Sequence, residues 1–220
     1  MKKLMRDDLL NLGRAQGWKL ESAAPVNQVL SAMACGQRVA IFQEVGRRDW
    51  WLAWGGLPDG CTLVDALPPA DTADALILIS DRLYPVPPGL GEATLIYRPP
   101  SLALGVATCR DVDRDDFSAQ VTATLLRHGL SELSLAAVGV AALRRHAAAL
   151  NDFTDERELP LLPYPADKLA LLRGMLPRRP RRLAGTAAAA ALLAAGAQHL
   201  LAAPTVAGRS VLAIARRTLS

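Results

Sequence analysis

The stretch RPPSLALGVATCR, residues 98–110, decides how the chain is interpreted, because it joins an Arg-Pro-Pro corner to a short apolar run. The apolar part, LALGVAT (102–108), has the length and composition of a buried β-strand. Thr108, Cys109 and Arg110 follow at its end, so the run either delivers a thiol to a reaction or threads a strand through a core. Both interpretations stay open on local grounds.

Strands and helices alternate regularly after this run. Helices are predicted at 113–129, 141–153, 166–175 and 186–196, and strands at 132–140, 159–165, 199–203 and 210–217. Asp113 is a candidate N-cap for the first helix, and Gly129 closes it. Such alternation predicts a mostly parallel sheet with helices on both faces. The short link 203–210 predicts an antiparallel edge hairpin at the end of the chain.

The first half of the chain predicts a smaller α/β unit. Apolar spacing indicates one helix around Leu9 to Leu12 and another around Val26 to Met33, with Gly36 as its cap. Strands are predicted at 38–44, at WWLAW (50–54) and at 74–80. We therefore expect two small three-layer α/β units, 1–97 and 98–220, the second carrying the mostly parallel sheet and the edge hairpin.

Composition is that of a globular protein, with 51% hydrophobic and 21% charged residues. The 25 Lys and Arg against 21 Asp and Glu give a net charge of +4. This mild excess suits an acidic partner, or is simply a feature of a soluble surface. Aromatic residues make up 5%, too few for stacking platforms, so we expect no nucleic-acid partner.

The cysteines and the chain start indicate a compartment. Cys35, Cys61 and Cys109 are widely spaced, which predicts reduced thiols rather than a disulfide framework or zinc site. Two aspartates, Asp7 and Asp8, interrupt any signal peptide. The apolar run 183–197 falls short of the ~20 residues a membrane span needs. We expect a soluble, cytoplasmic protein with no membrane partner.

Candidate binding residues lie where strands end, because ligands of open α/β sheets bind beyond the carboxyl ends of the strands. Thr108 to Arg110 occupy such a position, and Asp81 with Arg82 follows the strand at 74–80. Cys109 beside Arg110 is either an activated thiolate or an inert buried thiol. The arginine cluster PRRPRR (177–182) is either an anion site or a solvated basic linker that binds nucleic acid weakly.

Metal and cofactor motifs are not found. The three histidines share no metal-ligand spacing, and the sequence has no G-x-G-x-x-G, phosphate loop or G-x-S-x-G. We therefore expect no metal and no cofactor.

Four segments of the second half carry a family resemblance. They are RPPSLALGVATCRDVDRDDF (98–117), ELPLLPYPADKL (158–169), GTAAAAALLAAGAQHLL (185–201) and SVLAIAR (210–216). Together they resemble the carboxyl-terminal domain of the CbiG and CobE proteins of cobalamin biosynthesis. GQRVAIFQE (36–44) and DALILISDR (74–82) are similar to the linking domain of CbiG, whose amino-terminal domain has no counterpart in this sequence.

The resemblance implies a substrate. CbiG is a cobalt-precorrin-5A hydrolase, which opens a δ-lactone on the macrocycle and releases a two-carbon aldehyde, whereas CobE has an accessory role. A corrin or precorrin intermediate carries many carboxylates, which suits the arginine excess. The residues implied to contact it are Arg98, Gly105, Thr108, Cys109, Arg110, Arg144, Asp81 and Gly185.

Several positions depart from the family pattern. Aligned without gaps, Thr108 takes the place of the family cysteine and Cys109 that of its first arginine. Ala147 and Ala188 stand where the family has glutamates. These changes remove the obvious acid–base groups for ester opening, so no catalytic residue is assigned and Asp81 is the remaining candidate for activating water.

Two hypotheses follow. The first is a cobalamin-biosynthesis protein that binds a corrin-ring intermediate, with or without lactone hydrolysis. The second is a non-enzymatic accessory or carrier protein that interacts with other enzymes of the pathway and carries an exposed apolar patch around Trp50, Trp51 and Trp54. Either is compatible with a homo-oligomer.

Overall fold

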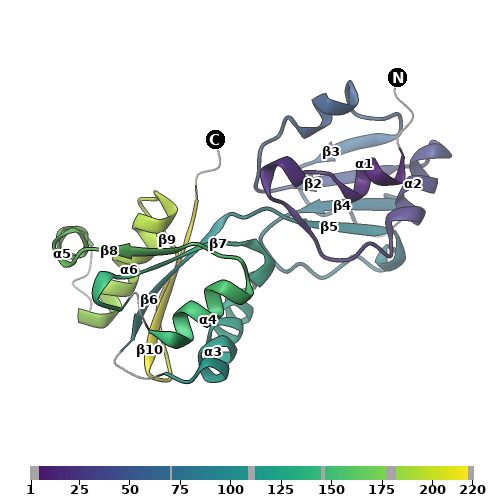
Figure 1. Cartoon of the computed structure of the whole chain (residues 1–220). Helices are drawn as coiled ribbons and strands as arrows, with labels where there is room; N and C mark the ends of the chain where they lie inside the picture. Colours follow the sequence, from purple (N-terminus) through teal and green to yellow (C-terminus); the bar gives the residue numbers. More distant parts are fainter. Residues whose placement is uncertain (1–4, 70, 109–111, 145–146, 177–181, 218–220) are drawn as a thin grey trace. The chain divides into compact units, whose positions relative to one another are not determined.

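A computed structural model gives the fold of the chain (Figure 1). It describes residues 5–69, 71–108, 112–144, 147–176 and 182–217, with the main chain alone described at 53, 54 and 144. This part of the chain divides into two compact units, with unit 1 ending at Pro100 and unit 2 beginning at Ser101. The division lies three residues beyond the expected one, because the last strand of unit 1 extends through Arg98, which pairs with Lys19.

Unit 1 is built on a five-stranded sheet in the order β1-β5-β4-β2-β3. Its strands are β1 (Lys19–Leu20), β2 (Val39–Gln43), β3 (Cys61–Val64), β4 (Ala75–Ile79) and β5 (Thr94–Arg98). All are parallel except β1. Helices α1 (Arg6–Leu10) and α2 (Val26–Ala34) pack on one face, whereas loop residues such as Tyr84 and Leu90 cover the other.

The aromatic segment WWLAW forms a 3-10 helix, η2 (Trp50–Trp54), so the predicted strand there is wrong. Main-chain bonds from Leu52 to Asp49 and from Gly55 to Leu52 close its turns. Trp50 is only 5% exposed, so the aromatic residue that suggested a strand is needed here to fill the core beside a turn. The strands that complete the sheet are β1, β3 and β5, none of which the sequence analysis predicted.

Unit 2 has the predicted architecture. Its sheet order is β8-β7-β6-β10-β9, made of β6 (Leu102–Thr108), β7 (Leu135–Ala141), β8 (Leu161–Tyr164), β9 (Leu200–Ala207) and β10 (Ser210–Arg216). Strands β6, β7 and β8 are parallel, and β10 and β9 form the antiparallel edge hairpin. Helices α3 (Arg114–Arg127) and α4 (Ala148–Glu156) cover one face, and α5 (Ala166–Met175) and α6 (Arg182–Ala195) the other.

Several predicted elements of unit 2 have different bounds: α6 begins at Arg182 rather than at 186, and β7 begins at Leu135 rather than at 132. Strand β9 continues through most of the expected link, leaving a two-residue turn at Gly208 and Arg209 in which Gly208 has φ +56°. The helix predicted at 141–153 is split, because β7 ends at Ala141 and a 3-10 turn, η5 (Ala142–Arg144), precedes α4.

Helix α6 lies unusually close to the sheet. Gly105 of β6 and Gly139 of β7 are register partners that face it. A Cβ atom at Gly105 would lie 2.0 Å from the Ala187 carbonyl oxygen, and one at Gly139 would lie 2.4 Å from that of Ala190. The alanine run therefore has a packing reason, since small residues on both sides allow the backbones to approach.

Two features are absent from the part of the chain that the structure describes. No helix there is long and apolar enough to cross a membrane. No cluster of three or more histidine, cysteine, aspartate or glutamate side chains there could hold a metal ion.

Candidate functional site

The strongest candidate site lies at the edge of unit 2 where its parallel strands end. Strands β6, β7 and β8 end at Thr108, Ala141 and Tyr164. Ser210, the first residue of β10, is the cross-strand partner of Thr108. We call this edge, defined by these four residues, the carboxyl edge, and it is the position at which open α/β sheets bind ligands.

Helix α3 begins beside the carboxyl edge at a well-formed cap. The Asp113 side chain accepts a hydrogen bond from the main-chain N–H of Asp115 at 2.9 Å and one from Asp116 at 3.3 Å. The N-cap predicted from the sequence is thereby confirmed, and it fixes where the chain leaves the edge.

The fold brings two of the predicted contact residues to the carboxyl edge. Thr108 lies there with 8% of its surface exposed. The main chain of Arg144 lies in η5, directly beyond the end of β7. Cys109 and Arg110 lie outside the described residues. Gly185 is buried in the first turn of α6.

Gly105 has a packing role, which differs from the expected approach to a ligand. It lies in the middle of β6, and its Cα faces the backbone of α6 at residues 187 and 191. No ligand group fits between this glycine and the helix, because even a methyl group would clash.

Arg98 is an interior residue of unit 1, which also differs from the expected contact with substrate carboxylates. Its side chain is 2% exposed and pairs with Glu21 at 2.8 Å. Its guanidinium also donates to the carbonyl oxygens of Ser80 at 2.8 Å and Arg82 at 2.6 Å. The guanidinium is buried and its donors bond to protein groups, so it stabilises the fold of unit 1 and is not placed to bind a ligand at the surface.

Asp81 lies in the turn that Arg98 supports. The residue is the second after the end of β4 and is fully buried. Next to it the Ser80 hydroxyl donates to the Glu44 carboxylate and accepts the main-chain N–H of Arg82 at 2.9 Å. This turn is therefore a cross-linked interior structure of unit 1.

Trp50 and Trp51 of η2, whose side chains are described, pack against the core rather than forming an exposed patch. The Trp50 ring is part of the core, and its indole N–H donates to the Gln43 side-chain oxygen at 2.8 Å. Trp51 is half-buried against the same core, and the Trp54 side chain is not described. Leu52 is exposed.

Cys61 is an inert thiol. It is buried at the start of β3, and burial raises its pKa to about 11, with the neighbouring Asp59 carboxylate adding to the effect. A thiol with this pKa is protonated at neutral pH and is a poor nucleophile.

Sequence reasoning missed three polar residues at the carboxyl edge and in α3 beside it. Tyr164 has a pKa raised by burial, and the Lys168 ammonium lies 5.7 Å from its ring. Ser210 is 1% exposed, and neither its hydroxyl oxygen nor the Gln120 side-chain oxygen has a hydrogen-bond partner among the described residues. No local sequence pattern marks Ser210, because it is brought to this edge by pairing with Thr108, a residue far away in the chain.

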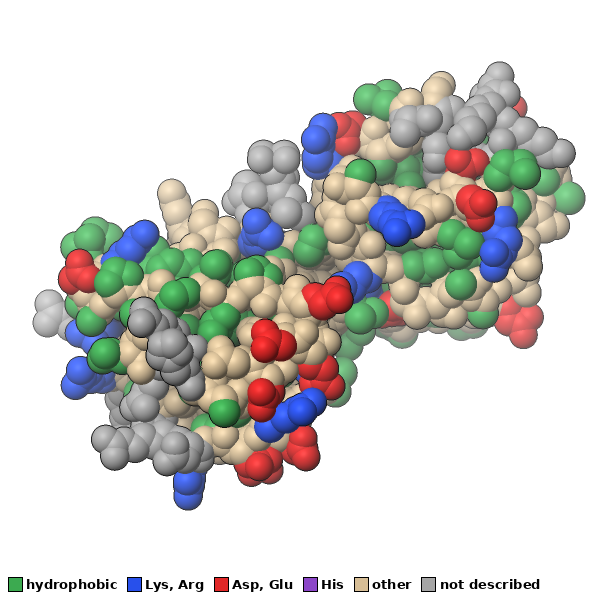
Figure 2. Space-filling model, in the orientation of Figure 1, with side chains coloured by type: hydrophobic (Ala, Val, Ile, Leu, Met, Phe, Trp, Pro, Cys, Tyr) green, Lys and Arg blue, Asp and Glu red, His purple; other side chains and the backbone are tan. Residues whose placement is uncertain are grey.

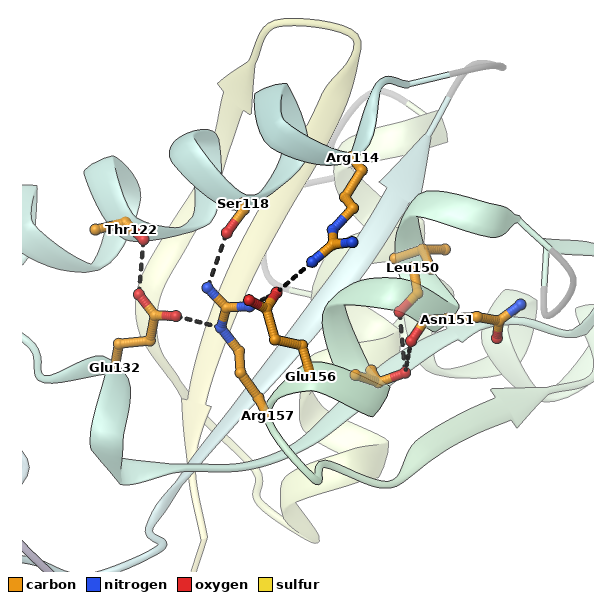
Figure 3. Close-up of polar contacts among 9 residues, drawn as sticks. Arg114, Ser118, Thr122, Glu132, Leu150, Asn151, Glu156 and Arg157 are labelled. Carbon is orange, nitrogen blue, oxygen red and sulfur yellow. Dashed lines mark hydrogen bonds and ion pairs between the residues drawn. The ribbon is translucent and has the colours of Figure 1, made fainter.

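The outer face of α3 and α4 is acidic (Figure 2). It exposes carboxylates at residues 113, 115, 116, 152, 155 and 156. An ionic network joins these helices to the turn before β7 (Figure 3): Arg157 pairs with Glu132 and with Glu156, and Arg114 pairs with Glu156 at 3.2 Å. These arginines hold the pKa of Glu156 below its usual value, with Arg114 the larger influence. A ligand rich in carboxylates would be repelled by this face.

Two family models together match most of the chain. A family model described as the cobalamin synthesis G C-terminus (CbiG_C) matches residues 102–215, more than half of the chain. A model of the cobalamin biosynthesis central region (CbiG_mid) matches residues 11–99. The chain belongs to the CbiG/CobE family of cobalamin biosynthesis proteins. Its two matched regions meet where unit 1 ends and unit 2 begins.

Individual relatives within the CbiG/CobE family are distant. The cobalt-precorrin-5A hydrolase of Priestia megaterium is 28% identical over 134 residues, which are 60% of this chain and 34% of that protein. The chain therefore spans about a third of the length of that relative.

Solved structures of the family are similarly distant. A cobalamin biosynthesis protein G homolog from Sulfolobus solfataricus has a TM-score of 0.46 at 14% identity, covering 97% of this chain and 60% of that one. CobE, from the cobalamin biosynthetic pathway, has a TM-score of 0.47 at 24% identity, covering 56% of this chain and 95% of that one.

Proposed function

We propose that the chain binds a corrin-ring intermediate of cobalamin biosynthesis, with cobalt-precorrin-5A as the first candidate. The observation that carries the proposal is the match of both CbiG family models along the chain, at 11–99 and 102–215. The hydrolase from Priestia megaterium supplies the name of the candidate ligand.

The carboxyl edge of unit 2 is the proposed binding site. In sheets of this topology the ligand lies beyond the strand ends, where Thr108 and the η5 turn are found. We assign the carboxylates of the macrocycle to Arg110 and Arg144, because guanidinium groups bind carboxylates through paired hydrogen bonds. Arg98, Gly105 and Asp81 support the fold from buried positions and are left out of this assignment.

A titration of the purified chain with cobalt-precorrin-5A, followed by visible absorbance, tests the proposal. We expect a spectral shift that saturates, and a weaker affinity for Arg144→Ala than for wild type. A matched control is Arg127→Ala, an exposed arginine at the far end of α3. Absence of any shift for the wild-type chain would contradict the proposal.

Product analysis of the same mixture separates the two forms of the function. Ring-opened product would make the chain a lactone hydrolase. Binding without product would make it an accessory or carrier protein, as the loss of the family's acid–base residues favours.

A further inference from the structure

The outer edge of β3 is the least protected sheet edge in the described part of the chain. The two sheets there end in β1 and β3 of unit 1 and in β8 and β9 of unit 2. Strand β1 has only two residues, and β8 and β9 contain Pro163 and Pro204. Short length and proline prevent an edge from pairing with another chain. Strand β3, CTLV (61–64), has no proline or lysine and pairs with β2 without a bulge.

The main chain of Leu63 faces outward from this edge. The Val39 N–H donates to the Gly60 carbonyl at 2.9 Å, which fixes the alternation of the parallel ladder between β2 and β3. In such a ladder, Thr62 and Val64 direct their main-chain groups towards β2, whereas the N–H and C=O of Leu63 point the other way. No strand of described residues lies on that side, so both groups are available to an added strand.

A cavity of 370 Å³ opens beside β3, on the face of the sheet opposite α1 and α2. Its lining is mostly apolar and includes Ala40 of β2, Thr62 and Val64 of β3, and loop residues 66–69. The charged residue of the lining, Arg38, is held by Asp74 at 2.8 Å. Alternate side chains of an added strand would lie on this face, so a large apolar one among them would fit the cavity.

The opposite face of β3 has an apolar side chain that an added strand would cover. Cys61 belongs to the core on the helix side of the sheet, and Leu63, two residues further on, lies on the same side. Leu63 is nevertheless 47% exposed. A strand beside β3 would bury part of this leucine under its own apolar side chains.

The charges at the two ends of β3 indicate what kind of strand fits. Asp59 precedes the strand and Asp65 follows it; both are exposed, and neither has an ion pair among the described residues. A segment with a basic residue near each end would be complementary. Antiparallel pairing of two copies of the chain would instead bring the Asp59 end of one β3 against the Asp65 end of the other, which is unfavourable.

We propose that β3 binds an extended segment of another protein, which adds a strand to the sheet of unit 1. The segment has a large apolar side chain for the cavity and a basic residue near each end, for Asp59 and Asp65. This surface is independent of the carboxyl edge of unit 2 and of the function proposed for it.

A synthetic peptide with these properties is the probe for the test. It has about seven residues, the length of an ordinary strand: arginine, threonine, valine, phenylalanine, valine, threonine and arginine. A control peptide has glutamate in place of both arginines, and a second has alanine in place of phenylalanine. Titration calorimetry would compare wild type with Leu63→Pro and with Leu63→Thr.

We expect saturable binding of the arginine peptide to wild type, and binding at least about tenfold weaker to Leu63→Pro. Proline removes the outward N–H without removing a ladder bond, so this variant should still fold, which its thermal midpoint checks. Leu63→Thr, the matched control, keeps the N–H and should retain most of the affinity. Both control peptides should bind more weakly than the arginine peptide.

Amide hydrogen exchange would locate the bound strand, because the Leu63 amide should become protected when the peptide is added. Absence of binding to wild type would overturn the proposal, as would equal affinity of wild type and a folded Leu63→Pro. Equal binding of the arginine and glutamate peptides would exclude the complementary charges. A wild-type dimer in sedimentation that Leu63→Pro dissociates would assign the edge to a second copy of the chain and so overturn the proposed partner.

Discussion

At the scale of single residues, Gly105 shows how the sheet admits helix α6. Replacing it with alanine would place a methyl group 2.0 Å from one backbone atom of α6 and 2.3 Å from another. Backbone atoms cannot rotate away as side-chain ends do, so we expect Gly105→Ala to lower the free energy of unfolding by about 3 kcal/mol. Urea denaturation would measure the loss.

The control for Gly105 is Gly174, a glycine in α5 with nothing within 4 Å of its missing Cβ. Alanine there should raise stability by about 0.5–1 kcal/mol, because a helix favours alanine over glycine. Equal effects of the two substitutions would contradict the packing argument.

The ion pair of Asp74 predicts how the stability of the protein depends on pH. It accepts hydrogen bonds from the Arg38 main-chain N–H at 2.9 Å and from its guanidinium at 2.8 and 3.1 Å. These bonds lower the pKa of Asp74 to about 2. Because the folded pKa is depressed, the stabilisation is present above the ordinary pKa near 4 and is lost as pH falls towards 2.

We therefore expect Asp74→Asn to be less stable than wild type at pH 5–7, with the difference shrinking between about pH 4 and about pH 2. Urea midpoints across this range would measure it. Asp152→Asn, at an exposed position in α4, is the control. A difference between wild type and Asp74→Asn that does not change with pH would exclude the ionised carboxylate as its source.

At the scale of elements, two helices of unit 2 end in the same turn with different residues. After α3, Leu130 N–H bonds to the Leu125 carbonyl at 2.9 Å, and Gly129 takes φ +64°. After α4, Leu159 N–H bonds to the Thr154 carbonyl at 2.8 Å, and Glu158 takes φ +54°. A left-handed residue is required in both turns, and only the first has glycine.

Reciprocal substitutions test this comparison. Glu158→Gly should raise the free energy of unfolding by about 1 kcal/mol, because glycine has no Cβ to strain in the left-handed region. Gly129→Ala, where no neighbour lies within 4 Å, should lower it by a similar amount for the same reason. Both are measured by chemical denaturation, and changes of the same sign would contradict the argument.

The elements that the sequence predicted well are those with local signals. Helix α3 has a capping aspartate at one end and Gly129 at the other, and α5 has the predicted bounds. Strands β1 and β3 were missed because they have only two and four residues, whereas β5 is as long as the predicted β2 and β4 and is specified by its neighbours in the sheet. The η2 segment was mistaken for a strand because aromatic content cannot distinguish a strand from a buried tryptophan in a turn.

In the candidate site, too, the residues with a local sequence signal were predicted and those placed by long-range pairing were not. Thr108 was predicted because it ends a recognisable apolar run. The position of Ser210 beside Thr108 was not predicted, because it depends on β10 pairing with β6 between that strand and β9. Arg98 was expected at a ligand, but its partners Glu21, Ser80 and Arg82 come from three separate places in unit 1. Long-range pairing of this kind leaves no periodic mark in the sequence.

At the scale of the whole molecule, the two units have separate cores. The buried clusters of unit 1 contain only residues up to Tyr97, and those of unit 2 only residues from Leu102 onwards. No apolar cluster of described residues contains members of both. Each unit therefore has the buried surface that independent folding requires.

We expect residues 101–220 expressed alone to fold, with a helical and strand circular dichroism spectrum and one cooperative thermal transition. The fragment contains the whole carboxyl edge, so it should also bind whatever corrin-ring intermediate the full chain binds. Its matched control is a fragment that ends at residue 198 and lacks the final hairpin. Because β10 pairs with β6 in the middle of the sheet, this shorter fragment should not fold. A fragment 101–220 that melts without cooperativity would show that unit 2 depends on unit 1, despite the separation of their cores.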